Sequence, residues 1–237
     1  MPQRLLPLPS QEDYSLHKWV VSACNEVASR WVLRGPAEDN PRMACFCGAP
    51  QSGKTHLAHI FAHSYQGLFV AQPPDESPRF FFEKYHTFSV FAFDDIQNFM
   101  ERWLFEAFNM LREGPVSVLF VSAFPPSSDI WLLKDWASRL RSLPFLPLEN
   151  PDDELLAKVM KKRLEDCGVR IETDALRSLQ QHIPRTFSAI QKWTRILDEA
   201  SLRFCRPITR AFIRELVAEV ASDSDAEFPL DFDNVAD

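Results

Sequence analysis

The 237-residue chain has only six glycines, and no apolar stretch approaches the ~18 uncharged residues of a membrane-spanning helix. We therefore predict no membrane segment and no membrane partner. The first residues are polar and lack the apolar core of a secretion signal, so we expect a cytoplasmic protein. The five cysteines are odd in number and scattered, which argues against a disulfide framework. Apolar residues make up 46% of the chain, enough for a buried core.

Positive charge is scarce where the chain is most acidic. The net charge is −7, and residues 223–237 hold six carboxylates with no Lys or Arg, which leaves only −1 for residues 1–222. A near-neutral body has no electrostatic footprint for tight DNA binding, so we expect no strong direct DNA binding. The acidic end has the composition of a disordered tail.

Two of the six glycines lie in residues 48–55, which read Gly-Ala-Pro-Gln-Ser-Gly-Lys-Thr. This pattern, between an apolar run and a helix-forming stretch, is typical of a phosphate-binding loop. Its glycines let backbone N–H groups converge, and the helix that follows adds its positive dipole end. We expect Lys54 to contact phosphates and the Thr55 hydroxyl to bind Mg²⁺. The sequence thus predicts ADP or ATP binding with Mg²⁺, through Gly48, Gln51, Ser52, Gly53, Lys54, Thr55 and His56.

Apolar runs alternate with helical patterns as far as residue 150, which predicts a parallel sheet covered on both faces. Expected strands are 43–47, 67–71, 88–95, 116–122 and 144–148, and expected helices include 23–33, capped by Ser22, and 102–112. Residues 72–87 are predicted to be irregular. Beyond residue 150 the pattern is helical, over 152–166, 174–181, 186–204 and a last helix capped by Thr209. The expected organisation is a flexible peptide 1–13, a P-loop domain 14–150, a helical lid 151–221 and a tail 222–237.

Two carboxylates, Asp94 and Asp95, end the third predicted strand. Ligands of parallel sheets bind at the carboxyl ends of the strands, so both carboxylates are expected beside the phosphate loop. We expect Asp94 to hold Mg²⁺ and Asp95 to polarise an attacking water. Val20 and Val21 precede the first helix, where an apolar slot for adenine and plain core packing are both consistent with the sequence.

Three arginines are candidates for reading a γ-phosphate. Arg139 lies between the last two strands, from where it can complete a neighbouring subunit's site as an arginine finger. Arg141 is its competitor, and an ordinary surface arginine is the alternative for either. Arg185 starts the long helix of the lid, from where its guanidinium is expected to fold back on the γ-phosphate and couple the domain angle to the nucleotide.

Five motifs, in this order along the chain, resemble the AAA+ module of the bacterial replication initiator DnaA. They are the phosphate loop with Thr55-His56-Leu57, the run 93–97 (Phe-Asp-Asp-Ile-Gln), the run 105–111, Ser138-Arg139-Leu140 and Arg185. The resemblance covers roughly residues 14–220 and implies a three-layer AAA+ fold followed by a helical lid. Initiators carry a polar sensor residue where this chain has Ala123. We therefore expect weak or no intrinsic hydrolysis, because the attacking water is held less well.

The ends of the chain differ from DnaA. We expect neither its long N-terminal domain nor its helix-turn-helix domain. Residues 3–8 read Gln-Arg-Leu-Leu-Pro-Leu, similar to the Gln-Leu-x-Leu-Pro-Leu peptide that binds the sliding clamp, the β subunit of DNA polymerase III, although Arg4 replaces the first Leu. A DnaA module with such a peptide resembles the Hda family of regulatory inactivators of DnaA. That resemblance implies a replication regulator that binds the clamp through Gln3, Leu5, Leu6, Pro7 and Leu8.

Members of that family stimulate DnaA to hydrolyse its ATP, which prevents re-initiation. The same resemblance implies that Arg139 reaches the nucleotide of the partner DnaA and that Arg185 is the sensor-2 arginine. Two other classes stay open: a DnaC-like helicase loader that touches single-stranded DNA, and a stand-alone P-loop ATPase or kinase. The sequence also leaves open whether ADP or ATP is the working nucleotide, whether the chain forms a homodimer, and whether residues 227–232 dock a partner.

Overall fold

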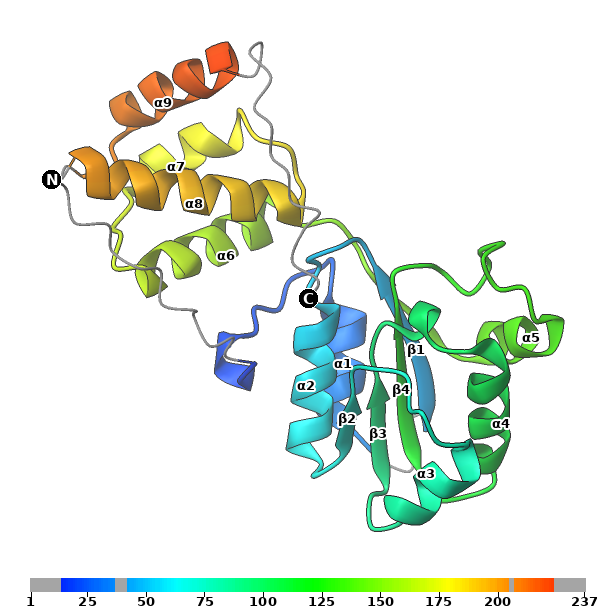
Figure 1. Ribbon diagram of the computed structural model, residues 1–237. Helices are drawn as coiled ribbons and strands as arrows, with labels where there is room; N and C mark the ends of the chain where they lie inside the picture. The colour runs from blue at the N-terminus through cyan, green and yellow to red at the C-terminus, as the bar shows by residue number, and fades with distance from the viewer. Residues whose placement is uncertain (1–13, 37–41, 205–206, 224–237) are drawn as a thin grey trace, which may run out of the picture. The chain divides into compact units, whose positions relative to one another are not determined.

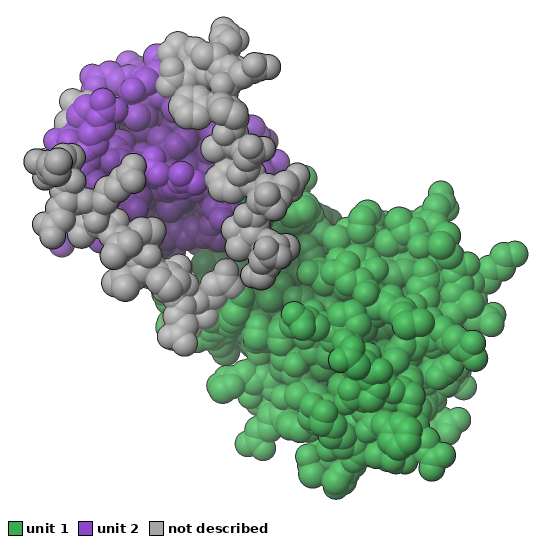
Figure 2. Space-filling view, viewed as in Figure 1, with its two compact units in different colours: residues 1–150 green, residues 151–237 purple. Residues whose placement is uncertain are grey.

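The computed structural model describes residues 14–36, 42–204 and 207–223, and divides the chain into two compact units. Unit 1 is Met1–Asn150 and unit 2 is Pro151–Asp237 (Figure 2). Among the described residues, none of the helices combines the length and the apolar character needed to span a bilayer.

Unit 1 is built on a sheet of five parallel strands. They are β1 (Met43–Gly48), β2 (Leu68–Val70), β3 (Val90–Phe93), β4 (Ser117–Ser122) and β5 (Phe145–Leu148), in the spatial order β2-β3-β4-β1-β5 (Figure 1). The predicted parallel sheet is confirmed. Strand β4 lies between β1 and β3, with Cys47 paired to Ser122 and Phe93 paired to Phe120. The residues that follow these three strands therefore meet at one edge of the sheet.

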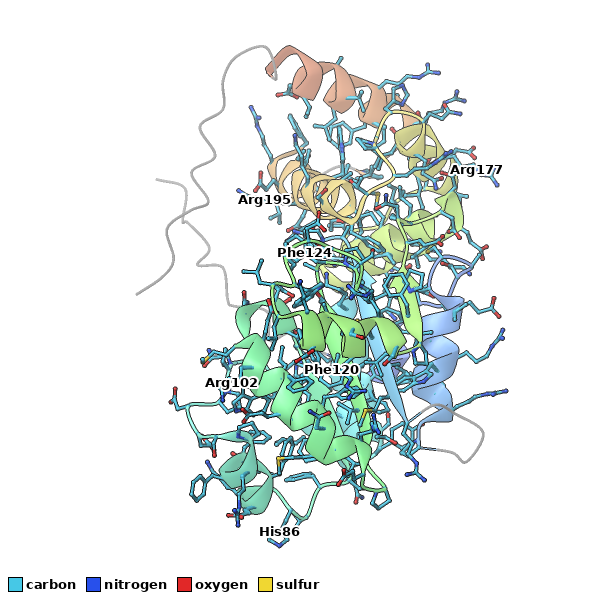
Figure 3. All side chains as sticks on the ribbon, turned by 90° about the vertical axis from the view of Figure 1, so that its right-hand side faces the viewer. His86, Arg102, Phe120, Phe124, Arg177 and Arg195 are labelled. Atoms are coloured by element: carbon cyan, nitrogen blue, oxygen red, sulfur yellow. The ribbon has the colours of Figure 1, made fainter. Side chains whose placement is uncertain are left out.

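Helices cover both faces of this sheet (Figure 1). Helices α1 (Glu26–Arg34) and α2 (Lys54–Ser64) pack on one face, and α3 (Pro78–Lys84), α4 (Glu101–Arg112) and α5 (Lys134–Ser142) on the other. Side chains alternate between the two faces along each strand, as the pleat requires. In β4, Leu119 and Val121 join the α2 side, whereas Val118 and Phe120 join the α4–α5 side (Figure 3 labels Phe120).

Two predictions for unit 1 were wrong in detail. Residues 72–87 are not wholly irregular, because they contain α3, which begins with a proline at its first position, where no N–H is needed. Its Phe81 is buried in the core, and this burial stabilises a helix too short for its periodicity to be recognised. The first helix begins at Glu26, not at Ala23, and Asn25 occupies its N-cap position instead of Ser22. The Asn25 amide oxygen accepts a hydrogen bond from the Ser22 N–H at 2.9 Å, which fixes the turn before the helix.

Unit 2 contains four helices within its described residues: α6 (Asp153–Asp166), α7 (Thr173–Gln180), α8 (Phe187–Phe204) and α9 (Arg210–Asp223). The helices predicted from periodicity are confirmed to within about two residues. The Asp152 carboxylate caps α6 by accepting from the Leu155 N–H at 2.6 Å, and the Thr209 hydroxyl lies 3.4 Å from the Phe212 N–H of α9. Leu156, Ile190 and Ile213 are completely buried between these helices.

Candidate functional site

The loop between β1 and α2 is too tight for side chains at its two glycines. A Cβ on Gly48 would lie 2.6 Å from the Leu148 carbonyl oxygen and 2.8 Å from the Ser52 hydroxyl. Gly53 has φ +89°, and a Cβ there would lie 2.7 Å from the Trp19 ring. Only glycine therefore fits at these two positions, where the backbone approaches its neighbours closely, as in a phosphate-binding loop.

Lys54 begins α2 and folds back over the loop. Its Nζ donates to the carbonyl oxygens of Gly48 at 3.0 Å and Ala49 at 2.9 Å. Burial lowers the pKa of Lys54, while the nearby charges of Asp95 and Asp94 act in the opposite direction. Two neutral carbonyls are a weak match for a partly buried ammonium, which favours an anionic partner.

The hydroxyl of Ser52 has no hydrogen-bond partner among the described residues, although its side chain is buried. A buried hydroxyl without a partner destabilises the fold unless a bound group satisfies it. It lies in the same loop as Lys54, directly before α2, whose first N–H groups also lack intrahelical acceptors. The loop therefore has unsatisfied donors, which suit a phosphate.

Thr55 and Asp94, both predicted to hold a metal, lie in contact. The Thr55 Oγ1 donates to the Asp94 Oδ2 at 2.7 Å, and the Asp95 N–H donates to the Asp94 Oδ1 at 3.0 Å. Burial raises the pKa of the Asp94 carboxyl. In the described residues there is no cluster of three or more acidic, His or Cys side chains suited to a metal. One carboxylate plus a hydroxyl fits Mg²⁺, which takes its other ligands from phosphates and water.

Asp95 is held by a residue that sequence reasoning quoted but gave no role. Asp95 has the left-handed conformation, with φ 46°, and its Oδ1 accepts from the Gln97 Nε2 at 3.0 Å. The Gln97 Oε1 accepts from the Ser122 hydroxyl and from the Ala123 N–H, both at 3.2 Å. The end of β4 thus reaches Asp95 through Gln97. The only sequence signal was a polar side chain two residues after the Asp pair.

Comparison with known proteins agrees with this arrangement. No protein-family model matches the chain. DnaA from Lachnoclostridium phytofermentans is 27% identical over 198 residues, covering 72% of this chain and 43% of that protein. DnaA from Nostoc punctiforme is 25% identical, covering 69% of this chain and 41% of that protein. The chain is homologous to part of DnaA. It spans less than half the length of the curated relatives it matches.

Solved structures show the fold. Domain III of the Thermotoga maritima DnaA superposes with a TM-score of 0.68 at 17% identity, covering 90% of this chain and 98% of that one. AMPPCP-bound DnaA from Aquifex aeolicus superposes with a TM-score of 0.67 at 16% identity, covering 90% of this chain and 70% of that one. The RuvB Holliday junction motor of T. maritima superposes with a TM-score of 0.59 at 18% identity, covering 80% of this chain and 65% of that one. The fold is therefore the AAA+ P-loop fold, as predicted.

Three other residues predicted to bind the nucleotide can be placed on this DnaA-like fold. Val21 is 44% exposed and borders a shallow cavity of about 330 Å³ with Ser29 and Leu33 of α1, so it is not part of the core. Val20 is partly buried, and its carbonyl accepts from the Asn25 side chain at 2.9 Å. The His56 ring lies against the segment before α1, with Nε2 3.2 Å from the Ser15 carbonyl oxygen. His56 lies in the first turn of α2, so its backbone N–H, and not its ring, is the group expected to bind a phosphate.

The three candidate arginines lie on other elements than this loop. Arg139, on α5, is half-buried, and its guanidinium lies 6.0 Å from the centre of the Phe108 ring, on the sheet face opposite α2. Its competitor Arg141 is exposed on the same helix. Arg185 belongs to unit 2, where its Nε and Nη2 donate to the two Asp153 carboxylate oxygens at 2.7 and 2.8 Å. The predicted clamp-binding residues Gln3, Leu5, Leu6, Pro7 and Leu8 lie outside the described residues.

Proposed function

We propose that this chain is a nucleotide-binding AAA+ regulator of replication initiation, which binds ADP or ATP with Mg²⁺ at the loop before α2. The observation that carries the proposal is the set of unsatisfied or weakly matched groups there. The Ser52 hydroxyl has no partner among the described residues, and the Lys54 ammonium rests on two loop carbonyls. Both solved DnaA relatives with bound AMPPCP share the fold that presents this loop.

Side chains of the loop and of the elements beside it have separate roles in this binding. Lys54 would exchange its two carbonyl partners for phosphate oxygens, and the Ser52 hydroxyl and the first N–H groups of α2 would donate to the same phosphates. Thr55 and Asp94, already 2.7 Å apart, would hold Mg²⁺. An ion bound there would supply positive charge to neutralise the phosphates. Val21, at the edge of an open cavity, is the candidate contact for the base.

The regulatory part of the proposal rests on Arg139 and Ala123. Arg139 lies on the opposite face of the sheet from α2, so we expect it to serve the site of another subunit and not the loop before α2. Ala123 has no polar side chain to hold an attacking water, and its backbone N–H already donates to the Gln97 amide oxygen. We therefore expect little intrinsic hydrolysis. The chain would then act on the nucleotide of DnaA in trans, while residues 3–8 dock on the sliding clamp.

Two measurements test the proposal. The thermal midpoint of the purified protein should rise with added ADP or ATP in the presence of Mg²⁺, because a ligand of the folded state stabilises it. No rise with either nucleotide contradicts nucleotide binding. A pull-down with the sliding clamp should lose the protein when residues 1–10 are deleted, and retention at the wild-type level contradicts clamp docking. Binding of single-stranded DNA by the same preparation would favour the helicase-loader class instead.

A further inference from the structure

Ala123 provides no side-chain hydrogen bond at the end of β4, yet that strand end is connected to the acidic pair. The connection passes through one amide side chain, that of Gln97, in the short 3₁₀ turn Ile96–Asn98 that follows Asp95. The Gln97 Nε2 lies 3.0 Å from the Asp95 Oδ1, and the Gln97 Oε1 lies 3.2 Å from both the Ser122 hydroxyl and the Ala123 N–H. The ends of two neighbouring strands, β3 and β4, therefore share one hydrogen-bonded side chain.

The orientation of this amide is determined by its neighbours. A backbone N–H only donates, so the Gln97 oxygen must face Ala123. A carboxylate only accepts, so the Gln97 nitrogen must face Asp95. The Ser122 hydroxyl is completely buried and accepts from the Phe124 N–H at 2.9 Å, which commits its own proton to Gln97. These hydrogen bonds form a relay from the end of β4 through Gln97 to Asp95, and each bond in it has a fixed donor and acceptor. Only a side chain that carries an acceptor beside a donor completes this relay.

The relay decides which oxygen of Asp95 is available. Gln97 occupies Oδ1, and Oδ2 has no hydrogen-bond partner among the residues that the structure describes. Asp95 also has a left-handed backbone, an uncommon conformation that surrounding contacts must maintain. Its charge acts on Lys54 more strongly than that of Asp94, so the position of this carboxylate affects the group expected at the β- and γ-phosphates. Turning Asp95 would therefore change the field around Lys54, the group expected to contact the β- and γ-phosphates.

We propose that Gln97 is a positioning residue that holds the Asp95 carboxylate against the end of β4, and thereby sets how the site distinguishes a nucleoside triphosphate from a diphosphate. It does for this chain what a polar side chain at residue 123 would otherwise do. The inference rests on the proposed nucleotide binding and goes beyond it, because it assigns the discrimination between the two ligands to one side chain that itself need not contact either of them.

The test compares dissociation constants for ADP and for AMPPCP, both with Mg²⁺, in full-length wild-type protein and in Gln97→Ala. Without Gln97 the Asp95 carboxylate is free to turn toward the γ-phosphate and repel it. We expect AMPPCP to bind about tenfold more weakly, the usual effect of losing one hydrogen bond to a charged group, while ADP stays within about twofold. Gln97→Glu has nearly the same shape but opposes a second carboxylate to Asp95, so it should weaken AMPPCP binding at least as much.

Two further variants separate positioning from a merely structural role. Ser122→Ala removes one of the two donors to Gln97 and leaves the Ala123 N–H, so it should weaken AMPPCP binding less, by about two- to threefold. In an Asp95→Ala background, Gln97→Ala should have no further effect on AMPPCP, because the residue acts through Asp95. Thermal midpoints without nucleotide show whether each variant is folded.

Several results would overturn the inference. Equal weakening of ADP and AMPPCP would assign Gln97 to the fold alone, and additive effects of the Gln97 and Asp95 substitutions would show that it does not act through that carboxylate. Wild-type affinities in the variants would contradict it as well. These outcomes require that the wild type bind nucleotide. If the wild type binds neither ligand, the proposed function is wrong and this inference is wrong with it.

Discussion

The two units treat their candidate phosphate-binding groups in opposite ways. In unit 1 the buried Ser52 hydroxyl lacks a partner among the described residues, and Lys54 is matched only by carbonyls. In unit 2 the expected phosphate reader, Arg185, already has a bidentate partner in Asp153. That pair is exposed, at 67% for the Arg185 side chain and 58% for the Asp153 side chain.

This difference indicates which unit has polar groups that are suited to an anion before any ligand binds. Buried polar groups without full partners destabilise the apo fold, so their presence in the loop before α2 indicates a site that only a ligand completes. An exposed ion pair is worth at most about 1 kcal/mol, so Arg185 can leave Asp153 at little cost when a better anion is present. Under the proposed function, the loop is arranged for a phosphate before the ligand binds, whereas Arg185 would first have to leave Asp153.

The largest expected effect concerns a residue in unit 1 that lies away from the loop. Arg139→Ala should lower stimulation of the initiator's ATPase by about 10³-fold, because an arginine finger stabilises charge in the partner's transition state. Affinity of the chain for its own nucleotide should stay within about twofold. Arg141→Ala, the competing candidate on the same helix, should leave the stimulation unchanged, and a loss in that variant instead would make Arg141 the finger. If Arg139→Ala lost both activities equally, Arg139 would belong to this chain's own site.

Lys54→Ala tests the loop itself. We expect at least about 100-fold weaker binding of ADP, since the ammonium supplies the main charge-assisted contact with the phosphates. Titration calorimetry measures the change, with Lys134→Ala on the exposed start of α5 as the control. Nucleotide binding that survives in Lys54→Ala would show that the contrast between the two units is wrong.

Asp94 gives unit 1 a pH dependence that can be measured without nucleotide. Burial raises its pKa above the ordinary 3.8, so the folded protein keeps this proton at pH values where the unfolded chain releases it. Stability without nucleotide should therefore decline as the pH rises from about 3.8 through the raised pKa, by at most about 1.4 kcal/mol per pH unit for one proton. Urea unfolding between pH 4 and 7 should show a smaller decline in Asp94→Asn. Parallel curves for the two proteins would contradict this assignment.

Ser52→Ala should change folding and binding in opposite directions. Removing a buried hydroxyl without a partner should stabilise the nucleotide-free protein by about 1 kcal/mol, while the loss of a phosphate donor should weaken ADP binding several-fold. Chemical unfolding and calorimetry on the same samples measure the two effects. Ser127→Ala, at an exposed serine in the turn after β4, is the control. A destabilised Ser52→Ala protein would mean that the hydroxyl is already satisfied.

Asp153→Ala gives the smallest expected change in stability. Because the Arg185 pair is exposed, unfolding should become easier by only about 0.5 kcal/mol. If Arg185 reads the γ-phosphate, its release should strengthen AMPPCP binding by about two- to threefold and leave ADP unchanged. Glu199→Ala breaks the comparable Arg195–Glu199 pair, which lies 2.9 Å apart on α8, and serves as the control. The same response to both substitutions would remove Arg185 from the phosphate site.

Local patterns predicted much of the molecule. The spacing of Gly48, Gly53, Lys54 and Thr55 located the loop, and helical periodicity placed α6 to α9 within about two residues. Helix α3 was missed because seven residues are too few for periodicity, and burial of Phe81 decides its structure. Gln97 was part of a recognised run, but nothing in the run states that its amide reaches from Asp95 to Ala123.

By itself the sequence determined most of the elements, although not α3, because glycine spacing, caps and apolar periodicity act over a few neighbouring residues. The tertiary structure alone decided what those elements bring together. Placing β4 between β1 and β3 sets Ser122 beside Cys47 on one side and brings it within reach of Gln97 on the other. The order of the strands follows from how two sets of helices bury the two faces of one sheet. Strands that pair are far apart in the sequence, so which of them become neighbours depends on the whole core.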